Sequence, residues 1–504
     1  MKGFVFVYGK EVILRFFSTT AFRELSKKHD LTFVALRSSS LLKEGGVDEF
    51  LSSEFPKLEW INFYPGRFNR WTELFNISCN LYQERSSSFQ IRNQELAKKT
   101  PLKNDLLESF THSDSYKEYR EAVEEDMGLH PDILALTLRE RPDFFMLPSA
   151  LLDYCTDDIL QIAEKLSIPT AMLIAGWDNL SSKGLLYHLP SVIGVWGEQN
   201  RRHAVEIQKI PADHVFLIGA PHYDNFHPTQ MADQTKMRAS LGLPENRKII
   251  LFAGTFRLFD ETELLKEIDQ AIDSGLLPPM HILYRPHPWR VKRKSEEDYF
   301  ANSWRHISMD PEIEKTYQTA KIKDRGAVPD DFAIRMNHLE NIYQIVDAVI
   351  SPMSTILLES LLFGLPTMAV AFGDGKHSWS ADKVSKMEHF KELYQIPEIL
   401  VCRNKVDFFQ LVNKLITLSE KKNLNEILYK RTEDFVYRDK YPYAQRVANL
   451  VDAMLASKAE KPGYDKIFLK PGKTYSPNLL QQGWMIIKKI KSKVWKIIKH
   501  RNSN

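Results

Sequence analysis

The segment Asp347-Ala-Val-Ile-Ser-Pro-Met-Ser-Thr-Ile-Leu-Leu-Glu-Ser-Leu-Leu-Phe-Gly-Leu-Pro-Thr-Met-Ala-Val370 predicts a complete βαβ unit. Its first apolar run predicts a short buried strand that ends at Ser351, before a turn marked by proline. A helix is expected to open at Ser354 or Thr355 and to stop at Gly364-Leu-Pro366, after which a second strand follows. An open, mostly parallel sheet is the architecture that such units build.

The chemistry of this segment points to a nucleotide. Hydroxyl side chains at the first turn of a helix lie beside free backbone amides and the positive end of the helix dipole, which together favour a phosphate. Glu359, four residues after Thr355, lies one turn deeper on the same face, where a carboxylate can hold ribose hydroxyls. The alternative is that Ser354 only caps its helix and Glu359 belongs to a solvated face. The apolar neighbours of Glu359 leave little solvated face, which favours nucleotide binding.

This pattern resembles the nucleotide-binding helix of GT-B glycosyltransferases and of sugar-nucleotide epimerases that share their fold. The resemblance implies that Ser354 and Thr355 meet the phosphate of the donor and that Glu359 meets its ribose.

Composition excludes several classes of protein. The chain has 504 residues and 43% hydrophobic residues, which is enough for roughly two domains. Its three cysteines are far apart and predict neither a disulfide framework nor a metal site, as in a reducing compartment. The start of the chain predicts a first β-strand rather than a signal peptide, and no apolar run approaches the ~20 residues of a membrane span.

The positive charge is concentrated at the end of the chain. Residues 466–504 contain ten Lys/Arg and no Asp or Glu, so residues 1–465 hold 58 basic and 65 acidic residues, a balance of −7. A mildly acidic body argues against a nucleic-acid partner.

Alternating apolar runs and helical segments predict an α/β protein of the GT-B architecture, in which two Rossmann-like domains face each other across a cleft. We expect an N-terminal acceptor domain over residues 1–228, with a helical insertion at about 70–128, and a C-terminal donor domain over 235–440. A helix within 441–465 is expected to pack back on the N-terminal domain, and 466–504 to form a basic amphipathic tail.

The second motif is Arg285-Pro-His287-Pro288-Trp289, directly after a predicted strand. The prolines hold the chain extended, so His287 lies at the carboxyl end of the strand, where ligands of such sheets bind. From this position an imidazole can donate a hydrogen bond or a proton to a leaving phosphate, and Arg285 can neutralise its charge. A histidine that bonds a nearby carbonyl is the alternative.

A His-Pro motif followed by a Ser/Thr motif resembles bacterial sialyltransferases and capsule-type Kdo transferases, which are GT-B enzymes that use CMP-activated acidic sugars. The similarity covers residues 236–400 and implies that His287, Ser354 and Thr355 contact the donor phosphate. Pro288 and Ser351, which belong to the same two motifs, are further expected donor-binding residues. Ser351-Pro-Met-Ser354 with Glu359 departs from that pattern. This form resembles UDP-sugar enzymes and, more distantly, the CDP-glycerol transferases of teichoic-acid synthesis, so the base of the donor stays open.

A small turn and two polar clusters complete the predicted cleft. Gly254 and Thr255 end the first strand of the C-terminal domain, where their amides can approach a diphosphate. On the acceptor side, Asp178 follows a strand and is our first candidate for the base that deprotonates the acceptor hydroxyl. The other expected acceptor contacts are Glu11, Arg15, Asn179 and His222. Helix capping and turn formation are the alternatives for these residues.

No Asp-x-Asp motif of the kind used by metal-dependent sugar transferases occurs in the chain, so we expect no metal and no cofactor beyond the nucleotide-sugar substrate. A Walker loop is absent as well.

The tail predicts membrane attachment. Trp484, Ile487, Ile490, Val494 and Ile498 form one helical stripe, with lysines mostly on the other side. Such a helix lies in an anionic membrane surface. Docking of this helix on the N-terminal domain is the alternative, although the segment from Tyr443 to Leu455 fits that role better.

The sequence therefore predicts an inverting, metal-independent glycosyltransferase, cytoplasmic and peripheral on the inner face of the cytoplasmic membrane. It would transfer a sugar from a nucleotide donor to a lipid-linked acceptor or a surface glycan such as lipopolysaccharide or capsule. A CMP-sugar such as CMP-Kdo or CMP-sialic acid is the favoured donor, and a UDP-sugar or a CDP-glycerol-type donor is the alternative. A sugar-nucleotide 2-epimerase and a catalytically silent glycan-binding scaffold are the other two classes.

Overall fold

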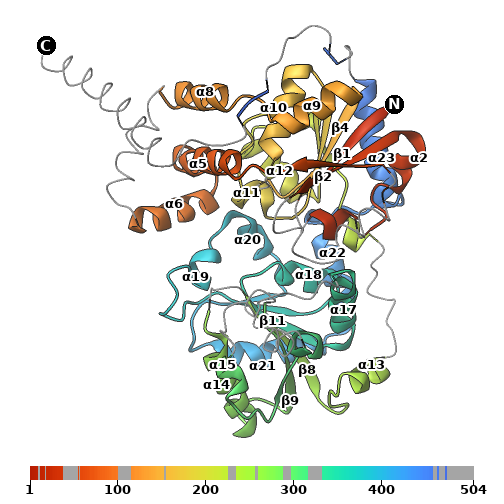
Figure 1. Cartoon of the computed structure of the whole chain (residues 1–504). Coiled ribbons are helices and arrows are strands. Elements are labelled where there is room, and N and C mark those ends of the chain that lie inside the picture. Colours follow the sequence, from red (N-terminus) through yellow and green to blue (C-terminus); the bar gives the residue numbers. More distant parts are fainter. Residues whose placement is uncertain are drawn as a thin grey trace, which may run out of the picture.

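The computed structural model describes residues 1–8, 12–17, 19–37, 55, 57–99, 115–151, 155–224, 234–255, 259–287, 297–315, 332–457, 462–464 and 471–473. The chain forms two α/β domains, one above the other in Figure 1, each built on a parallel sheet. Among the helices in these ranges, none has the length and apolar character that a membrane span requires. The GT-B fold class predicted from the sequence is confirmed.

The N-terminal domain is built on a seven-stranded sheet with the order β3-β2-β1-β4-β5-β6-β7. Its strands are β1 (Lys2–Val7), β2 (Asp30–Arg37), β3 (Leu58–Asn62), β4 (Phe144–Ser149), β5 (Thr170–Ile174), β6 (Val192–Val195) and β7 (Val215–Leu217). Because a parallel sheet is covered on both faces, its strands are apolar on both. Phe4 and Phe6 belong to one core cluster and Val5 and Val7 to the other.

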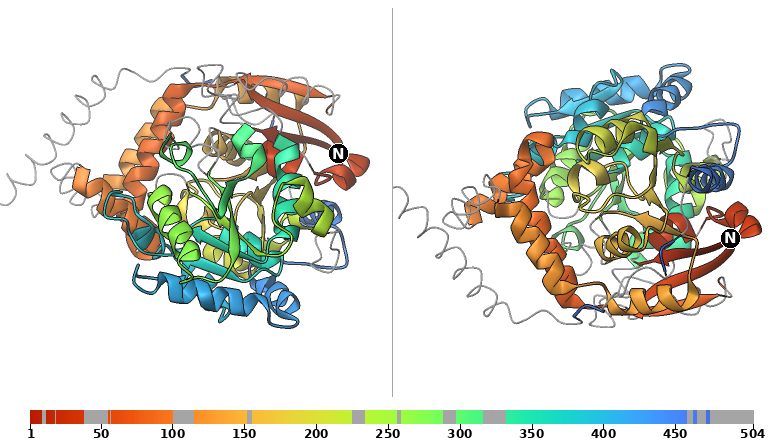
Figure 2. Two further views of the ribbon diagram at one scale, coloured as in Figure 1. Left: turned by 90° about the horizontal axis from the view of Figure 1, so that it is seen from below. Right: turned by 90° about the horizontal axis from the view of Figure 1, so that it is seen from above.

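Helices of this domain cover the sheet or extend from one side of it. The covering elements are η1 (Ile13–Phe17), α2 (Arg23–Lys28), α9 (Pro131–Glu140), α10 (Thr156–Leu166), α11 (Asn179–Ser182), α12 (Glu198–Glu206), η3 (Ala212–His214) and η4 (Pro221–Tyr223). The lateral elements are α5 (Pro65–Leu81), η2 (Gln83–Arg85), α6 (Ser87–Lys99) and α8 (Ser115–Met127). Figure 2 shows these lateral helices, in orange, along one side of the domain.

The C-terminal domain is built on a six-stranded sheet with the order β10-β9-β8-β11-β12-β13. Its strands are β8 (Lys248–Ala253), β9 (Met280–Arg285), β10 (Ile307–Met309), β11 (Ala348–Pro352), β12 (Thr367–Val370) and β13 (Ile399–Cys402). Its helices are α13 (Gln234–Ser240), α14 (Glu261–Asp273), α15 (Glu297–Phe300), α17 (Phe332–Ile345), α18 (Ile356–Leu362), α19 (Ala381–Val384), α20 (Glu388–Leu393), α21 (Phe408–Ser419), α22 (Leu424–Arg431) and η6 (Thr432–Asp434).

The chain returns to the N-terminal domain after η6. The N–H of Tyr437 donates a hydrogen bond of 2.6 Å to the carbonyl of Trp196, and α23 (Tyr443–Ala456) then packs its apolar face into the core beside α2, β5 and β6. Arg446 pairs with Asp224 at 2.6 Å and fixes this helix to the end of the N-terminal domain. Residues 474–504, which hold most of the predicted membrane tail, lie outside the described residues.

Candidate active site

The predicted donor side of the cleft lies at the carboxyl ends of three neighbouring strands, β9, β8 and β11. In the sheet register, Ala253 of β8 pairs with Arg285 of β9, and Ile350 of β11 pairs with Phe252 of β8. Ser351, the next residue of β11, therefore lies beside Ala253, and its hydroxyl donates a hydrogen bond of 2.8 Å to the carbonyl of Ala253. Parallel packing thus brings three predicted motifs to one edge of the sheet.

The turn between β11 and α18 carries a pair of serines. The hydroxyls of Ser351 and Ser354 lie 2.8 Å apart, and Thr355 is the N-cap residue of α18. The strand extends one residue further than predicted, to Pro352, and the helix begins at Ile356. Within the described part of the chain, no acceptor takes a hydrogen bond from the N–H groups of Ser354, Thr355 and Ile356. These three N–H groups are the unpaired donors that the sequence predicts at the start of the helix.

Glu359 is buried and oriented by a tyrosine. Only 8% of Glu359 is exposed, and the hydroxyl of Tyr343 on α17 donates a hydrogen bond of 3.0 Å to Oε2 of Glu359. Burial, and then the charge of Glu359, raise the pKa of Glu340, so a second carboxyl group lies within electrostatic reach. The solvated-face alternative for Glu359 is therefore excluded.

The turn at Gly254 and Thr255 differs from the expectation. The N–H of Gly254 donates to the carbonyl of Arg285 at 2.8 Å, and the N–H of Thr255 donates to Oε1 of Glu261 at 2.6 Å. A Cβ atom on Gly254 would lie 2.2 Å from Oε2 of Glu261, so the glycine is required by this buried carboxylate. Both amides that we expected to approach a diphosphate are already engaged within the protein.

Arg285 is also engaged. Its Nη1 forms a buried ion pair with Asp310, a fully buried residue just after β10, and Nε2 of His338 lies 2.8 Å from Asp310 Oδ1. Burial works to raise the pKa of Asp310, but Arg285 and His338 outweigh it and lower that pKa to about 2. This ion pair anchors the end of β9, and half-buried His287 lies two residues beyond it. Pro288 lies outside the described residues.

The acceptor side begins with Asp178, which precedes α11. The Nζ of Lys183 lies 3.4 Å from its Oδ2, and the hydroxyl of Ser182 donates to the same oxygen at 3.2 Å. Burial works to raise the pKa of Asp178, yet Lys183 and Arg15 help to hold that pKa below its usual value. Asp178 is therefore a carboxylate at neutral pH, and the neighbouring Asn179 donates to its Oδ1 at 3.2 Å.

Arg15 and His222 meet although 207 residues separate them. Nη1 of Arg15 lies 3.3 Å from Nε2 of His222, and the guanidinium lies 5.7 Å from the centre of the Trp196 ring. Burial and the charge of Arg15 lower the pKa of His222 well below its usual value. Because arginine can only donate, Nε2 accepts and the proton of this neutral imidazole is on Nδ1. Glu11 lies outside the described residues.

The two sides of the cleft approach each other at Tyr223. This residue of η4 belongs to the core cluster of the C-terminal domain, together with Trp177 and Trp196 of the N-terminal domain. Burial and the charge of Glu359 raise the pKa of the Tyr223 phenol well above its usual value. Arg15 and His222 are therefore near the predicted donor side through Tyr223.

Four residues that contact predicted site residues were not predicted from the sequence: Tyr343, Asp310, Glu261 and Trp196. Each is a buried polar or aromatic side chain next to a predicted site residue. In the sequence, the only signal for Tyr343, Asp310 and Glu261 is a polar side chain in or beside an apolar run, and Trp196 only ends such a run.

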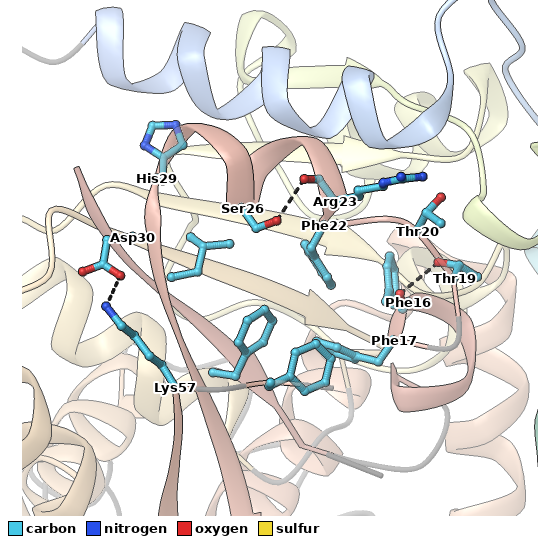
Figure 3. Close-up of a pocket in the computed structure, with 13 residues that line it drawn as sticks. Phe16, Phe17, Thr19, Thr20, Phe22, Arg23, Ser26, His29, Asp30 and Lys57 are labelled. Atoms are coloured by element: carbon cyan, nitrogen blue, oxygen red, sulfur yellow. Dashed lines mark hydrogen bonds and ion pairs between the residues drawn. The ribbon is translucent and has the colours of Figure 1, made fainter. Parts of the chain in front are cut away.

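The N-terminal domain also contains a pocket and a cluster of potential metal ligands, and both lie outside the predicted site. A pocket of about 450 Å³, drawn in Figure 3, lies between η1, α2 and the amino end of β2, whereas the predicted site lies at the carboxyl ends of the strands. A buried cluster of His130, Cys155 and Asp158 brings three potential metal ligands within 4.8 Å of one another. Nη2 of Arg67 lies 2.5 Å from Asp158 Oδ1 and already supplies a positive charge there.

Solved structures share this fold at low sequence identity. The co-structure of MnaA from S. aureus with UDP has a TM-score of 0.51 and 13% identity, and the alignment covers 92% of this chain and 99% of that chain. A protein from Listeria monocytogenes, provisionally assigned as a UDP-N-acetylglucosamine 2-epimerase, has a TM-score of 0.51 and 10% identity, with 93% and 99% coverage. At this identity the likeness shows the fold alone. No curated protein sequence gives a significant match.

A family match covers the donor side of the cleft. Residues 200–451, half of the chain, match the family described as CDP-Glycerol:Poly(glycerophosphate) glycerophosphotransferase. The matched range includes the whole second sheet, from β8 to β13, and the motifs at Arg285, His287, Ser354 and Glu359. This protein is therefore a transferase of the GT-B fold, and it belongs to the CDP-glycerol:poly(glycerophosphate) glycerophosphotransferase family.

Proposed function

We propose that this protein transfers a glycerophosphate-type group from a CDP-linked polyol to a hydroxyl of a surface glycan or a lipid-linked acceptor. The observation that carries the proposal is the family match over residues 200–451, because this range contains every donor-side motif. It favours the CDP-glycerol-type alternative over the CMP-sugar that the sequence analysis preferred.

The donor would bind at the strand ends of the C-terminal domain. Glu359, buried and oriented by Tyr343, supplies a carboxylate for the ribose hydroxyls. The amides at the start of α18, with the hydroxyls of Ser351 and Ser354, supply donors for a phosphate of the nucleotide. His287, beyond the anchored end of β9, would donate to the phosphate that leaves.

The reaction would be a single displacement. The oxygen of the acceptor hydroxyl attacks the phosphorus that bears the glycerol, the bond from that phosphorus to the oxygen of CMP breaks, and CMP leaves with the electron pair. Asp178, ionised at neutral pH, would take the proton of the hydroxyl, while Arg15 and Asn179 would orient the acceptor. His287 and the amides of α18 would stabilise the charge that develops on CMP.

Two experiments test the donor. A thermal-shift panel of CMP, CDP, UDP and GDP identifies the nucleotide, because a ligand of the folded state raises its stability by mass action. We expect a shift with CMP and CDP, and a shift with GDP alone would exclude the proposal. CDP-glycerol labelled at the phosphorus next to glycerol then separates the chemistries: that label moves to the acceptor here, whereas a CMP-sugar transfers no phosphorus and a UDP-sugar transferase releases UDP.

The epimerase alternative is supported by the fold alone. Incubation of the purified protein with a UDP-sugar and no acceptor would form the 2-epimer if this alternative held. A silent glycan-binding scaffold would give no thermal shift with any nucleotide. We also propose that the reaction requires no metal, so that EDTA leaves the transfer rate unchanged.

We further propose that the protein acts at the inner face of the cytoplasmic membrane. The support is the sequence of the tail, with ten basic residues, no acidic residue and an apolar helical stripe in 466–504. A surface anchor of this kind would keep the cleft near a lipid-linked acceptor.

A further inference from the structure

Two helices from different domains cap each other at one side of the cleft. Oε2 of Glu388, the first residue of α20, accepts hydrogen bonds of 2.8 Å from both the N–H and the hydroxyl of Ser87, the first residue of α6. In return, the N–H of Glu388 donates a hydrogen bond of 3.0 Å to the hydroxyl oxygen of Ser88. The first N–H groups of a helix have no partner within the helix, so each helix satisfies a donor of the other.

The charge of Glu388 strengthens this contact. Burial works to raise its pKa, but the hydrogen bonds from the N–H and hydroxyl of Ser87 and from Lys391 outweigh it and lower that pKa. A carboxylate is therefore present at neutral pH, at the end of α6 where the helix dipole favours a negative charge. Hydrogen bonds to a charged acceptor are about twice as strong as neutral ones.

A second pair of residues joins α6 to α19, the helix that precedes α20. Nζ of Lys383 on α19 donates a hydrogen bond of 2.8 Å to Oε1 of Glu95 on α6, and this bond is the largest cause of the lowered pKa of Glu95. We call Ser87, Ser88, Glu95, Lys383 and Glu388 the interdomain clasp. In Figure 1, α6 lies just above α19, and α20 is beside them toward the middle of the molecule.

The clasp is connected to the turn that carries Asp178. The hydroxyl of Ser86, directly before α6, donates a hydrogen bond of 2.7 Å to the carbonyl of Ser181 on α11. From the other side, the ring of Trp177 packs against His389 and Phe390 of α20, with ring centres 4.9 and 5.4 Å apart. The turn of Asp178 is therefore held between α6 and α20.

We propose that the interdomain clasp keeps the two domains closed on this side of the cleft and fixes the turn of Asp178 against the C-terminal domain. Glu388 is then a positioning residue, which acts on the acceptor through Asp178. This last step rests on the proposed function, whereas the closure does not. A small displacement of a reacting group lowers the rate strongly, so loosening the clasp affects turnover more than donor binding.

Hydrogen exchange of the full-length, nucleotide-free protein tests the closure. For Glu388→Ala we expect amides in residues 86–92 and 177–183 to exchange about tenfold faster, because both segments lose a contact that spans the domains. Glu267→Ala is the matched control, since Glu267 pairs at 2.5 Å with Lys405 inside the C-terminal domain. Unchanged exchange in both segments overturns the proposal. If Glu388→Ala fails to fold, Lys383→Ala replaces it, because this variant leaves both helix caps in place. We expect it to accelerate exchange in the same two segments by a smaller factor.

Kinetics test the positioning separately. We expect Glu388→Ala to lower kcat about tenfold with the apparent constant for the donor within about twofold, and Glu388→Gln, which keeps an acceptor oxygen, to recover part of the loss. If exchange accelerates while kcat equals that of Glu267→Ala, the positioning role is wrong and only the closure stands. If the unaltered protein transfers nothing, the proposed function fails, and the exchange result still decides the closure.

Discussion

The hydroxyl of Tyr343 donates a 3.0 Å hydrogen bond to Oε2 of Glu359, which joins α17 to α18. Both residues are buried, and burial, followed by the charge of Glu359, raises the pKa of Tyr343 well above its usual value. The phenol therefore keeps its proton and remains a donor. This hydrogen bond fixes the orientation of the Glu359 carboxylate.

We predict that Tyr343→Phe raises the apparent constant for the donor about fivefold and leaves kcat within about twofold, because a ground-state contact loses its orientation. Glu359→Ala should raise the same constant by more. Steady-state kinetics at varied donor concentration measure both effects. Tyr464→Phe, which removes a hydroxyl that donates to Pro142 in the N-terminal domain, is the control. Equal effects of the two tyrosine variants would contradict a role of Glu359 in donor binding.

We expect His287→Ala to lower kcat about 10²-fold or more and to weaken donor binding much less, because a contact to the leaving group strengthens as charge develops. His281→Ala is a control in the same strand: His281 Nε2 lies 2.8 Å from the hydroxyl of Ser308, and burial lowers its pKa to about 4. Small and equal changes in both kinetic constants for His287→Ala would make this histidine structural.

The pH dependence of the rate tests Asp178. Since its pKa lies below the usual value, the carboxylate is present throughout the neutral range. If Asp178 is the base, kcat/KM should be flat from about pH 5 to 8 and fall only in more acidic solution, and Asp178→Asn should lower kcat about 10²-fold or more. An acidic limb centred near pH 6 to 7 that persists in Asp178→Asn would assign the base to another group.

Asp310→Asn should destabilise the C-terminal domain by about 3–5 kcal/mol at pH 7, because Arg285 loses its buried partner. The pKa of Asp310 is about 2 in the folded protein, below the unfolded value of about 3.9. Its stabilisation is therefore present above about pH 4 and is lost as the pH falls toward 2. Melting temperatures across this range measure the difference.

The variant should lose stability at pH 7 and show a flatter pH dependence below pH 4 than the unaltered protein. Asp439→Asn, at an exposed position, should change neither. A steep acid limb that survives in Asp310→Asn would assign the acid sensitivity to other carboxyl groups.

Truncation after Asp465 should release the protein from anionic vesicles and leave transfer to a soluble acceptor analogue intact, because the basic residues and the apolar stripe of the tail lie beyond that point. Binding of the full-length protein should weaken steeply with salt, since charges are screened over about 8 Å at physiological ionic strength. Sedimentation with vesicles measures both. A truncated protein that unfolds, or that still sediments, would contradict the membrane role of the tail.

Much of the fold was predictable because its signals are local. Apolar runs such as Val5–Tyr8 and Thr170–Ile174 predict strands buried on both faces, and Gly364 with Pro366 marks the end of α18. The edge strand β10 was not predicted, because Ser308 interrupts the apolar residues of Ile307–Met309. The rule that ligands bind at the carboxyl ends of parallel strands then predicts the edge at which the donor binds.

The sequence by itself determined the two parallel sheets and the edge at which the donor motifs gather, because strand periodicity and helix stops act over a few residues. Only the tertiary structure decided the partners: Arg285 with Asp310, Tyr343 with Glu359, Arg15 with His222, and Ser87 with Glu388. These pairs join residues that are 16 to 301 positions apart. Their geometry depends on how whole helices and domains pack, and packing is fixed by burial summed over both cores rather than by any local pattern.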